Sequence, residues 1–251
     1  MTVNLCEITS KKEIGKGFFD YTFLCPDMAE SAVPGQFVHI LPEGFTLRRP
    51  ISICEIIGDT IRIIFETRGE GTEKLSEKNT GDCFDVLGPL GNGFSLTYSG
   101  DKAIFIGGGI GVPPLLEASK RYGQNATIIT GFRNSGAMIL TEDFKKITSD
   151  VHVATDDGSF GHHGLVTDIL KKRLERKADI MFACGPSPML KAVKRLSEEY
   201  GVPAQLSLEE RMGCGVGACL VCACKIQSSN GVEYRHVCKD GPVFNAEEVL
   251  M

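Results

Sequence analysis

Residues 102–123 read KAIFIGGGIGVPPLLEASKRYG. An apolar run leads into a glycine cluster and then into a segment with helical spacing, and the prolines at its start suit the first turn of a helix. Such a strand–turn–helix unit lets a phosphate approach the helix N-terminus. The cluster departs from G-x-G-x-x-G, and no acidic residue ends the next predicted strand to bind a ribose hydroxyl. The stretch predicts a nucleotide site at Gly107, Gly108, Gly109 and Gly111, with a tight turn that binds nothing as the alternative.

Downstream, apolar strands alternate with helical segments as far as residue 206. Strands are predicted at 126–132, 151–157 and 179–186, and helices at 141–147, 164–174 and 187–201. This alternation implies a parallel sheet with helices on both faces, and we assign residues 100–206 to a nucleotide-binding α/β domain.

Two further loops of this domain supply candidate nucleotide contacts. The turn ACGPSPML at 183–190 places Cys184 and Gly185 at the sheet edge where the reactive end of a nucleotide would lie. The loop after residue 155 offers Asp156 and Asp157, which would repel a 2′-phosphate and so favour NAD over NADP. Arg133, which follows the second strand, argues the other way because it would accept that phosphate.

Upstream, residues 1–99 read as short strands broken by Gly, Pro and Asp, at spacings typical of a small antiparallel β-barrel. RRPISI at 48–53 puts arginine beside a strand end, where it would neutralise a phosphate, and serine a few positions later. RGEGT at 68–72 offers free N–H groups and a hydroxyl at a predicted helix start, which suits a pyrophosphate. Taken alone, RRPISI also fits an edge strand that ends in Arg-Pro.

Residues 207–251 form a cysteine-rich C-terminal lobe. Cys214, Cys219 and Cys222 have the spacing C-x4-C-x2-C, and Cys238 follows. This is the plant-type ferredoxin spacing that binds a [2Fe–2S] cluster. Cys224 would lengthen the tight loop if it replaced Cys222, so we predict that it is not a ligand. A structural zinc site and plain buried cysteines are the alternatives, although zinc prefers paired C-x2-C knuckles.

Composition narrows the class of protein further. The chain has 251 residues, a net charge of −5 and no concentrated basic run, which argues against a nucleic-acid partner. No apolar stretch approaches the length of a membrane span, and the N-terminus lacks the pattern of a signal peptide. These features predict a cytoplasmic protein, in which ten reduced cysteines are expected to bind metal or carry out redox work.

Taken in order, the motifs resemble those of the ferredoxin-reductase flavoprotein superfamily, and within it the iron–sulfur electron-transfer subunits of NAD-linked dihydroorotate dehydrogenase. The resemblance spans nearly the whole chain. It rests on RRPIS, GEGT, GPLGNGF, GGGIGVPPL, ATDDGS, CGPSPML and MGCGVGACLVCACK followed by VCKDGPVF.

The resemblance implies an FAD-binding barrel, an NAD domain and a [2Fe–2S] lobe. Arg49, Pro50, Ile51 and Ser52 would hold the flavin, Ile64, Phe65 and Glu66 would line it, and Gly71 and Thr72 would hold its pyrophosphate. Cys214, Cys219, Cys222 and Cys238 would ligate the cluster. Glu66 departs from the family, which tends to have a basic residue at this position.

The resemblance also implies a role in pyrimidine biosynthesis. Electrons would pass from the flavin of an FMN-containing catalytic dihydroorotate dehydrogenase subunit, in a heterotetramer, through [2Fe–2S] and FAD to NAD+. This transfer needs no nucleophile–base pair, and the sequence offers no convincing one. The alternatives are a small subunit of another NAD(P)H-linked complex, such as a bifurcating transhydrogenase or a sulfide dehydrogenase, and a non-catalytic redox sensor.

Overall fold

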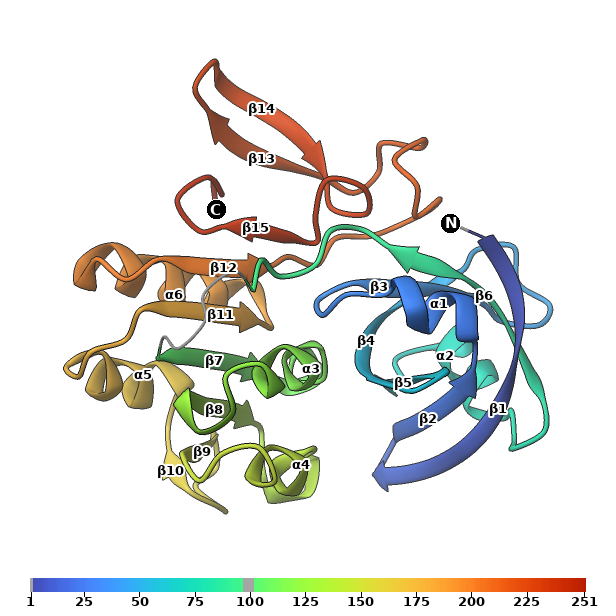
Figure 1. The fold of residues 1–251 in the computed structure, drawn as a ribbon, viewed down its shortest axis with the longest axis horizontal. Helices are drawn as coiled ribbons and strands as arrows, with labels where there is room; N and C mark the ends of the chain where they lie inside the picture. Colours follow the sequence, from blue (N-terminus) through green and yellow to red (C-terminus); the bar gives the residue numbers. More distant parts are fainter. Residues whose placement is uncertain (1, 97–101) are drawn as a thin grey trace.

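The computed structural model describes residues 2–96 and 102–251 and shows three neighbouring parts (Figure 1). The first is a closed antiparallel barrel with the strand order β1-β2-β5-β4-β3-β6. Its strands are β1 (Thr2–Gly15), β2 (Phe18–Leu24), β3 (Phe37–Leu41), β4 (Arg49–Ile57), β5 (Thr60–Glu66) and β6 (Cys83–Leu90), with short helices α1 (Pro26–Ser31) and α2 (Glu70–Ser76).

Alternation along the strands fills the barrel. In β6 every second side chain is buried, as expected when one face of a strand meets a core and the other meets solvent. The interior is aromatic at its centre, where the rings of Tyr21 and Phe84 meet edge to face with centroids 5.2 Å apart. The predicted antiparallel barrel is confirmed.

The second part is a seven-stranded sheet with the order β10-β9-β8-β7-β11-β12-β15. Its strands are β7 (Ala103–Gly108), β8 (Ala126–Phe132), β9 (Val151–Thr155), β10 (His162–His163), β11 (Ile180–Cys184), β12 (Ala204–Ser207) and β15 (Val243–Asn245). The strands from β7 to β12 run parallel, which confirms the predicted parallel sheet, whereas β15 runs antiparallel to β12.

Helices cover both faces of this sheet, as predicted. Apolar side chains of α5 (Val166–Leu174) and α6 (Ser187–Tyr200) pack on one face with Ile104 and Ile106. Those of α3 (Pro114–Lys120) and α4 (Thr141–Lys145) pack on the other with Phe105 and Phe182. The 3₁₀ turns are η1 (Gly109–Gly111), η2 (Gly123–Asn125) and η3 (Ser135–Ala137).

The order in which strands join the sheet reverses between β7 and β11, which themselves run parallel. Strands β8, β9 and β10 follow on one side of β7, and β11 and β12 lie on the other. Such a switch point leaves a crevice beyond the carboxyl ends of the two central strands, where open α/β sheets bind ligands. Both glycine turns singled out in the sequence begin here, because Gly107 on β7 pairs with Cys184 on β11.

The third part is the C-terminal lobe, which contains the hairpin of β13 (Ala223–Ser228) and β14 (Gly231–His236). Strand β15 from this lobe completes the edge of the α/β sheet, a contact that the sequence did not predict (Figure 1). The lobe also touches the barrel, because Asn92 donates from its side chain to the carbonyls of Lys239 and Asp240, at 3.2 and 2.9 Å. The lobe is therefore held by both other parts.

An ion network joins the barrel to the α/β domain. Arg62 on β5 contacts Asp20 and Glu55 of the barrel at 2.7 and 2.9 Å, and Asp143 of α4 at 3.6 Å. Lys120 of α3 in turn contacts Glu55 at 2.7 Å. Because Arg62 is largely buried, loss of one partner would leave a charge poorly solvated, which favours a fixed arrangement of the two domains.

Candidate functional site

A cavity of about 240 Å³ opens where the barrel meets the other two parts. Strands β4 and β5 pair side by side and present their ends to it. Seven of the residues predicted to hold or line a flavin form part of its wall. They are Pro50, Ile51, Ser52, Ile64, Phe65, Glu66 and Thr72.

The two remaining predicted flavin residues, Arg49 and Gly71, lie next to this cavity and against each other. A Cβ atom at Gly71 would overlap the guanidinium group of Arg49, so a larger residue here would have to push the arginine side chain away from its present position. Arg49 donates to the Leu47 carbonyl at 2.7 Å and lies over the ring of Phe45, 5.1 Å from its centroid. Among the described residues no carboxylate pairs with Arg49, which leaves its charge suited to an anion such as a pyrophosphate.

The hydroxyl of Thr72 stabilises the turn that leads into α2. It accepts a hydrogen bond from the Arg68 N–H at 2.9 Å and donates one to the Gly69 carbonyl at 2.9 Å. The turn is therefore shaped in advance beside Arg49. These residues fit the phosphate end of a dinucleotide such as FAD.

A second cavity, of about 660 Å³, lies beyond the carboxyl ends of β7 and β11. Its wall contains the predicted nucleotide residues Gly108, Gly109, Gly111, Asp156 and Gly185.

The other predicted nucleotide residues take different positions. Gly107 lines neither cavity, and a Cβ there would come within 2.8 Å of Val112 Cγ2, so its role is close packing of the turn. Cys184 lines the flavin cavity. Burial raises its pKa to about 12, reinforced by Glu209, so its thiol stays protonated. Asp157 lies outside the nucleotide cavity, whereas Arg133 lines it.

The two cavities share a wall. Glu66, Arg68, Ile110 and Glu209 line both, which makes the flavin and nucleotide sites adjacent. Glu66, the departure from the family pattern, pairs with Arg68 at 2.6 Å.

Sequence reasoning missed Glu209. The acid follows β12, which was not among the predicted strands, so no predicted strand end pointed to it. Glu209 is exposed on the side that faces solvent. Protein atoms surround its carboxyl group on the cavity side, and this burial raises the pKa of Glu209, whereas the positive charge of Arg68 opposes the shift.

On its other side, the flavin cavity is closed by the C-terminal lobe. Met212, which precedes the first cysteine of the motif, and Pro242, which follows the last, both line the cavity. Phe37 on β3 completes this wall and belongs to the same packed core as Cys222 and Cys238. The cysteine loop therefore lies directly behind the flavin cavity.

Backbone N–H groups converge on the cysteine sulfurs. Cys214 Sγ accepts from the N–H groups of Val216, Ala218 and Cys219 at 3.2 to 3.4 Å. Desolvation opposes ionisation, but these donors prevail and lower the pKa of Cys214 to about 6. Cys238 Sγ accepts from the Gly217 N–H at 3.1 Å. Donors of this kind stabilise the thiolates that a metal requires.

The four predicted ligands lie in two pairs. The side chains of Cys214 and Cys219 interact with each other, as do those of Cys222 and Cys238. Cys222 and Cys238 are buried, whereas Cys219 is exposed. Within residues 2–96 and 102–251, no three His, Cys, Asp or Glu side chains gather closely enough to hold a metal ion, so the structure brings the predicted ligands together only as two thiol pairs.

Cys224, the competitor for the third position, lies apart on β13. It is paired in register with Arg235 across the hairpin and packs against the hydrophobic core. Burial raises its pKa to about 11, and Glu210 adds to the effect.

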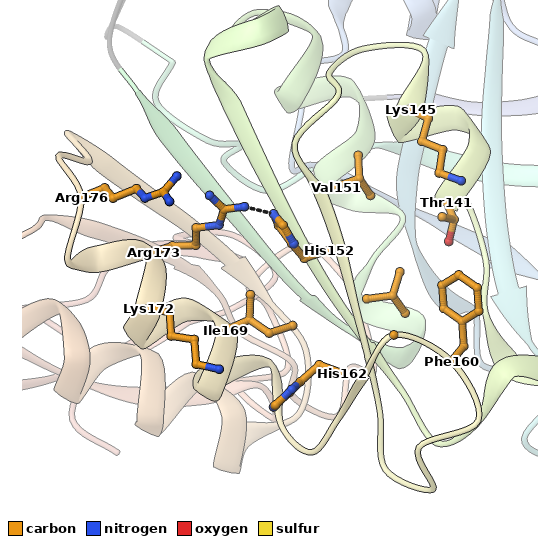
Figure 2. Close-up of a pocket in the computed structure, with 12 residues that line it drawn as sticks. Thr141, Lys145, Val151, His152, Phe160, His162, Ile169, Lys172, Arg173 and Arg176 are labelled. Carbon is orange, nitrogen blue, oxygen red and sulfur yellow. Dashed lines mark hydrogen bonds between the residues drawn. The ribbon is translucent and has the colours of Figure 1, made fainter.

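A third cavity, also of about 660 Å³, is basic and lies on the outer edge of the sheet between β9, α4 and α5 (Figure 2). Two of its cations are already paired, Arg173 with Asp150 at 2.6 Å and Lys145 with Glu142 at 2.8 Å. No predicted site residue lines it. It is therefore separate from the three adjoining sites above.

No helix of the described ranges combines the length and apolar character needed to cross a membrane.

Comparison with known proteins agrees with this geometry. Residues 209–250 match the family model described as the iron–sulfur cluster binding domain of dihydroorotate dehydrogenase B. The chain is 43% identical over 255 residues to the dihydroorotate dehydrogenase B (NAD(+)) electron transfer subunit of Bacillus caldolyticus, covering 97% of each. It is 40% identical to the protein of the same name from Caldanaerobacter subterraneus, covering 97% of this chain and 96% of that one.

A solved structure is also similar over almost the whole chain. It comes from work on flavin-based electron bifurcation by the NADH-dependent reduced ferredoxin-NADP oxidoreductase. That chain superposes with a TM-score of 0.84 at 33% identity, covering 98% of this chain and 90% of its own. Together with the full-length relatives, this shows that the chain belongs to the family of dihydroorotate dehydrogenase B (NAD(+)) electron transfer subunits.

Proposed function

We propose that the protein carries electrons from a catalytic dihydroorotate dehydrogenase subunit through a [2Fe–2S] cluster and FAD to NAD+, in pyrimidine biosynthesis. One observation carries the proposal. The flavin cavity is walled on one side by Ile110 and Cys184 of the nucleotide domain, and on the other by Met212 and Pro242 of the cysteine lobe. A flavin bound there has the nicotinamide nucleotide, which exchanges two electrons, on one side and the [2Fe–2S] cluster, which exchanges one, on the other.

The chemistry explains why the flavin site must lie in the middle. When bound, nicotinamide exchanges two electrons as hydride, a [2Fe–2S] cluster exchanges one, and a flavin does both. The three parts of the chain would hold these groups with the flavin in the middle. Residues 1–99 hold FAD, residues 100–206 hold NAD, and residues 207–251 hold the cluster through Cys214, Cys219, Cys222 and Cys238.

The residues of the flavin and nucleotide sites act by binding and orientation. Arg49, Gly71 and Thr72 bind the FAD pyrophosphate, and Pro50, Ile51, Ser52, Ile64, Phe65 and Glu66 hold and line the flavin. Gly108, Gly109, Gly111, Asp156 and Gly185 line the NAD site, Gly107 packs the turn beneath it, and Cys184 lies on the flavin side. No side chain has to remove a proton from a substrate carbon.

The partner is an FMN-containing catalytic subunit, in a heterotetramer, and it docks at the cysteine lobe. Next to the exposed Cys219, Leu220 and Val221 are 60% and 58% exposed. Apolar side chains exposed beside a predicted cluster ligand suit an interface that brings a second flavin close. Cysteine ligation of iron needs reduced thiols, which supports a cytoplasmic location.

The similarity to a bifurcating oxidoreductase supports a second candidate, the small subunit of another NAD(P)H-linked complex. The two candidates share the cofactors and differ in the partner. Purification of the tagged chain from its own cells distinguishes them. An FMN-containing subunit that oxidises dihydroorotate supports the first, and a different flavoprotein supports the second.

The first test is an anaerobic absorbance spectrum of the purified chain with flavin and iron quantified. We expect about one FAD and about two irons per chain. NADH should bleach the flavin band at catalytic rates, because the nucleotide and flavin cavities adjoin. Flavin that stays oxidised in the presence of NADH would instead favour the redox sensor.

We expect a preference of at least roughly tenfold for NADH over NADPH in kcat/KM, because a carboxylate facing a 2′-phosphate costs more than about 1.4 kcal/mol. Asp156 lines the nucleotide cavity and Asp157 does not, so Asp156→Asn should improve the use of NADPH. Asp157→Asn is the matched control and should leave the preference unchanged. Equal kcat/KM values for the two nucleotides in the unmodified protein would contradict the prediction.

A further inference from the structure

His39 is buried where the barrel meets the cysteine loop, and barrel stability alone does not call for a histidine there. It lies on β3 and is 0% exposed, and its ring lies against the backbone of Cys214 and Arg48. Neither ring nitrogen forms a well-aligned hydrogen bond with any described residue. Burial of polar atoms that are only weakly paired costs stability, and an apolar side chain would fill the same space without that cost.

The cysteine loop rests directly on this imidazole. Gly215 adopts a φ of 74°, and a Cβ atom there would come 2.5 Å from His39 Nδ1. The ring therefore occupies the space that a side chain would need, immediately beside Cys214. Gly217, in the same loop with a φ of 80°, instead faces the flexible side chain of Lys239.

The same residue is tied to the flavin cavity. His39 pairs in register with Pro50, and its ring meets that of Phe37 edge to face with centroids 6.4 Å apart. Both Pro50 and Phe37 line the flavin cavity. One face of β3 therefore touches the flavin site and the loop that begins the cysteine motif.

We propose that His39 is a positioning residue, which seats the Cys214 loop on β3 and so sets the position of the cluster relative to the flavin. The inference deepens the proposed function and rests on it. In the step that it affects, NADH is oxidised to NAD+ and delivers two electrons to the flavin as hydride; one electron then reduces one ferric iron of the cluster, and the other stays on the flavin.

The test replaces His39 with Leu and with Phe in the full chain. After anaerobic mixing with NADH, we expect the cluster to be reduced roughly tenfold more slowly, because such transfers lose rate steeply when the reacting groups are misplaced. The EPR signal of the dithionite-reduced cluster should shift or broaden, a readout that does not depend on turnover. Hydride transfer from NADH to the flavin does not involve the cysteine lobe, so the rate of flavin reduction serves as the internal control.

Two matched variants separate positioning from packing. Val38→Ala removes the neighbouring side chain, which is buried in the barrel core, and should lower the Tm without changing the EPR signal. Gly215→Ala should disturb the EPR signal more than Gly217→Ala. Both glycines have a positive φ, so alanine strains the backbone at either position, but only a Cβ at position 215 would contact His39.

Wild-type EPR and cluster reduction in both His39 variants would overturn the inference, as would equal effects of the two glycine variants. Loss of iron with FAD retained supports it, because the loop is then no longer seated. Should the His39 variants fail to fold, the glycine pair decides. Failure of NADH to reduce the flavin in the unmodified protein would instead refute the proposed function.

Discussion

Replacement of Cys222 with serine is expected to remove nearly all bound iron from the protein while FAD stays bound. The Cys222 side chain is buried, its sulfur accepts from the Cys238 N–H at 3.5 Å, and it pairs with the Cys238 side chain. Serine supplies no thiolate there, so one of the two irons would lose a ligand. Iron and sulfide assays and the EPR signal of the reduced protein measure the loss.

Cys224→Ser is the matched control, because it makes the same change two residues away. Cys224 lies on β13 opposite Arg235 and outside both thiol pairs, so its replacement should keep about two irons per chain. Iron lost from the Cys224 variant but kept in the Cys222 variant would show that the assigned ligand set is wrong.

The isolated chain is expected to oxidise NADH with an artificial acceptor and to show no dihydroorotate oxidation above background. Its described parts are an antiparallel barrel, one α/β sheet and a cysteine lobe. In the family that the chain resembles, dihydroorotate is oxidised on a separate (β/α)₈ subunit, a fold that takes about 250 residues by itself. None of these described parts is a (β/α)₈ barrel.

The measurement mixes the purified chain with dihydroorotate and NAD+ and follows NADH formation. The same sample must oxidise NADH with the artificial acceptor, which shows that its cofactors are loaded. Addition of the catalytic subunit should then start NADH formation. Turnover by the isolated chain at the rate of the complete complex would contradict the assignment as an electron-transfer subunit.

Local patterns in the sequence were enough for the fold class of the barrel and of the α/β sheet, but not for the β13–β14 hairpin of the cysteine lobe. The alternation in β6 and the strand–glycine–helix unit at residues 102–123 depend on neighbours along the chain, and the barrel and the parallel sheet followed from them. The ligand spacing of Cys214, Cys219 and Cys222 is likewise local, because a short loop limits which thiols can reach one cluster. Strand β15 was missed, since three residues carry no periodic signal and pair with β12 only after folding.

The sequence by itself determined which residue types could bind each group, because phosphate turns and cysteine loops are built from consecutive residues. Only the tertiary structure decided how the sites adjoin. Glu209, Met212 and Pro242 lie far along the chain from the barrel strands whose cavity they close. His39 belongs to none of the motifs, yet its ring lies against the backbone of Cys214. Such contacts arise from the packing of distant segments, which no local spacing encodes.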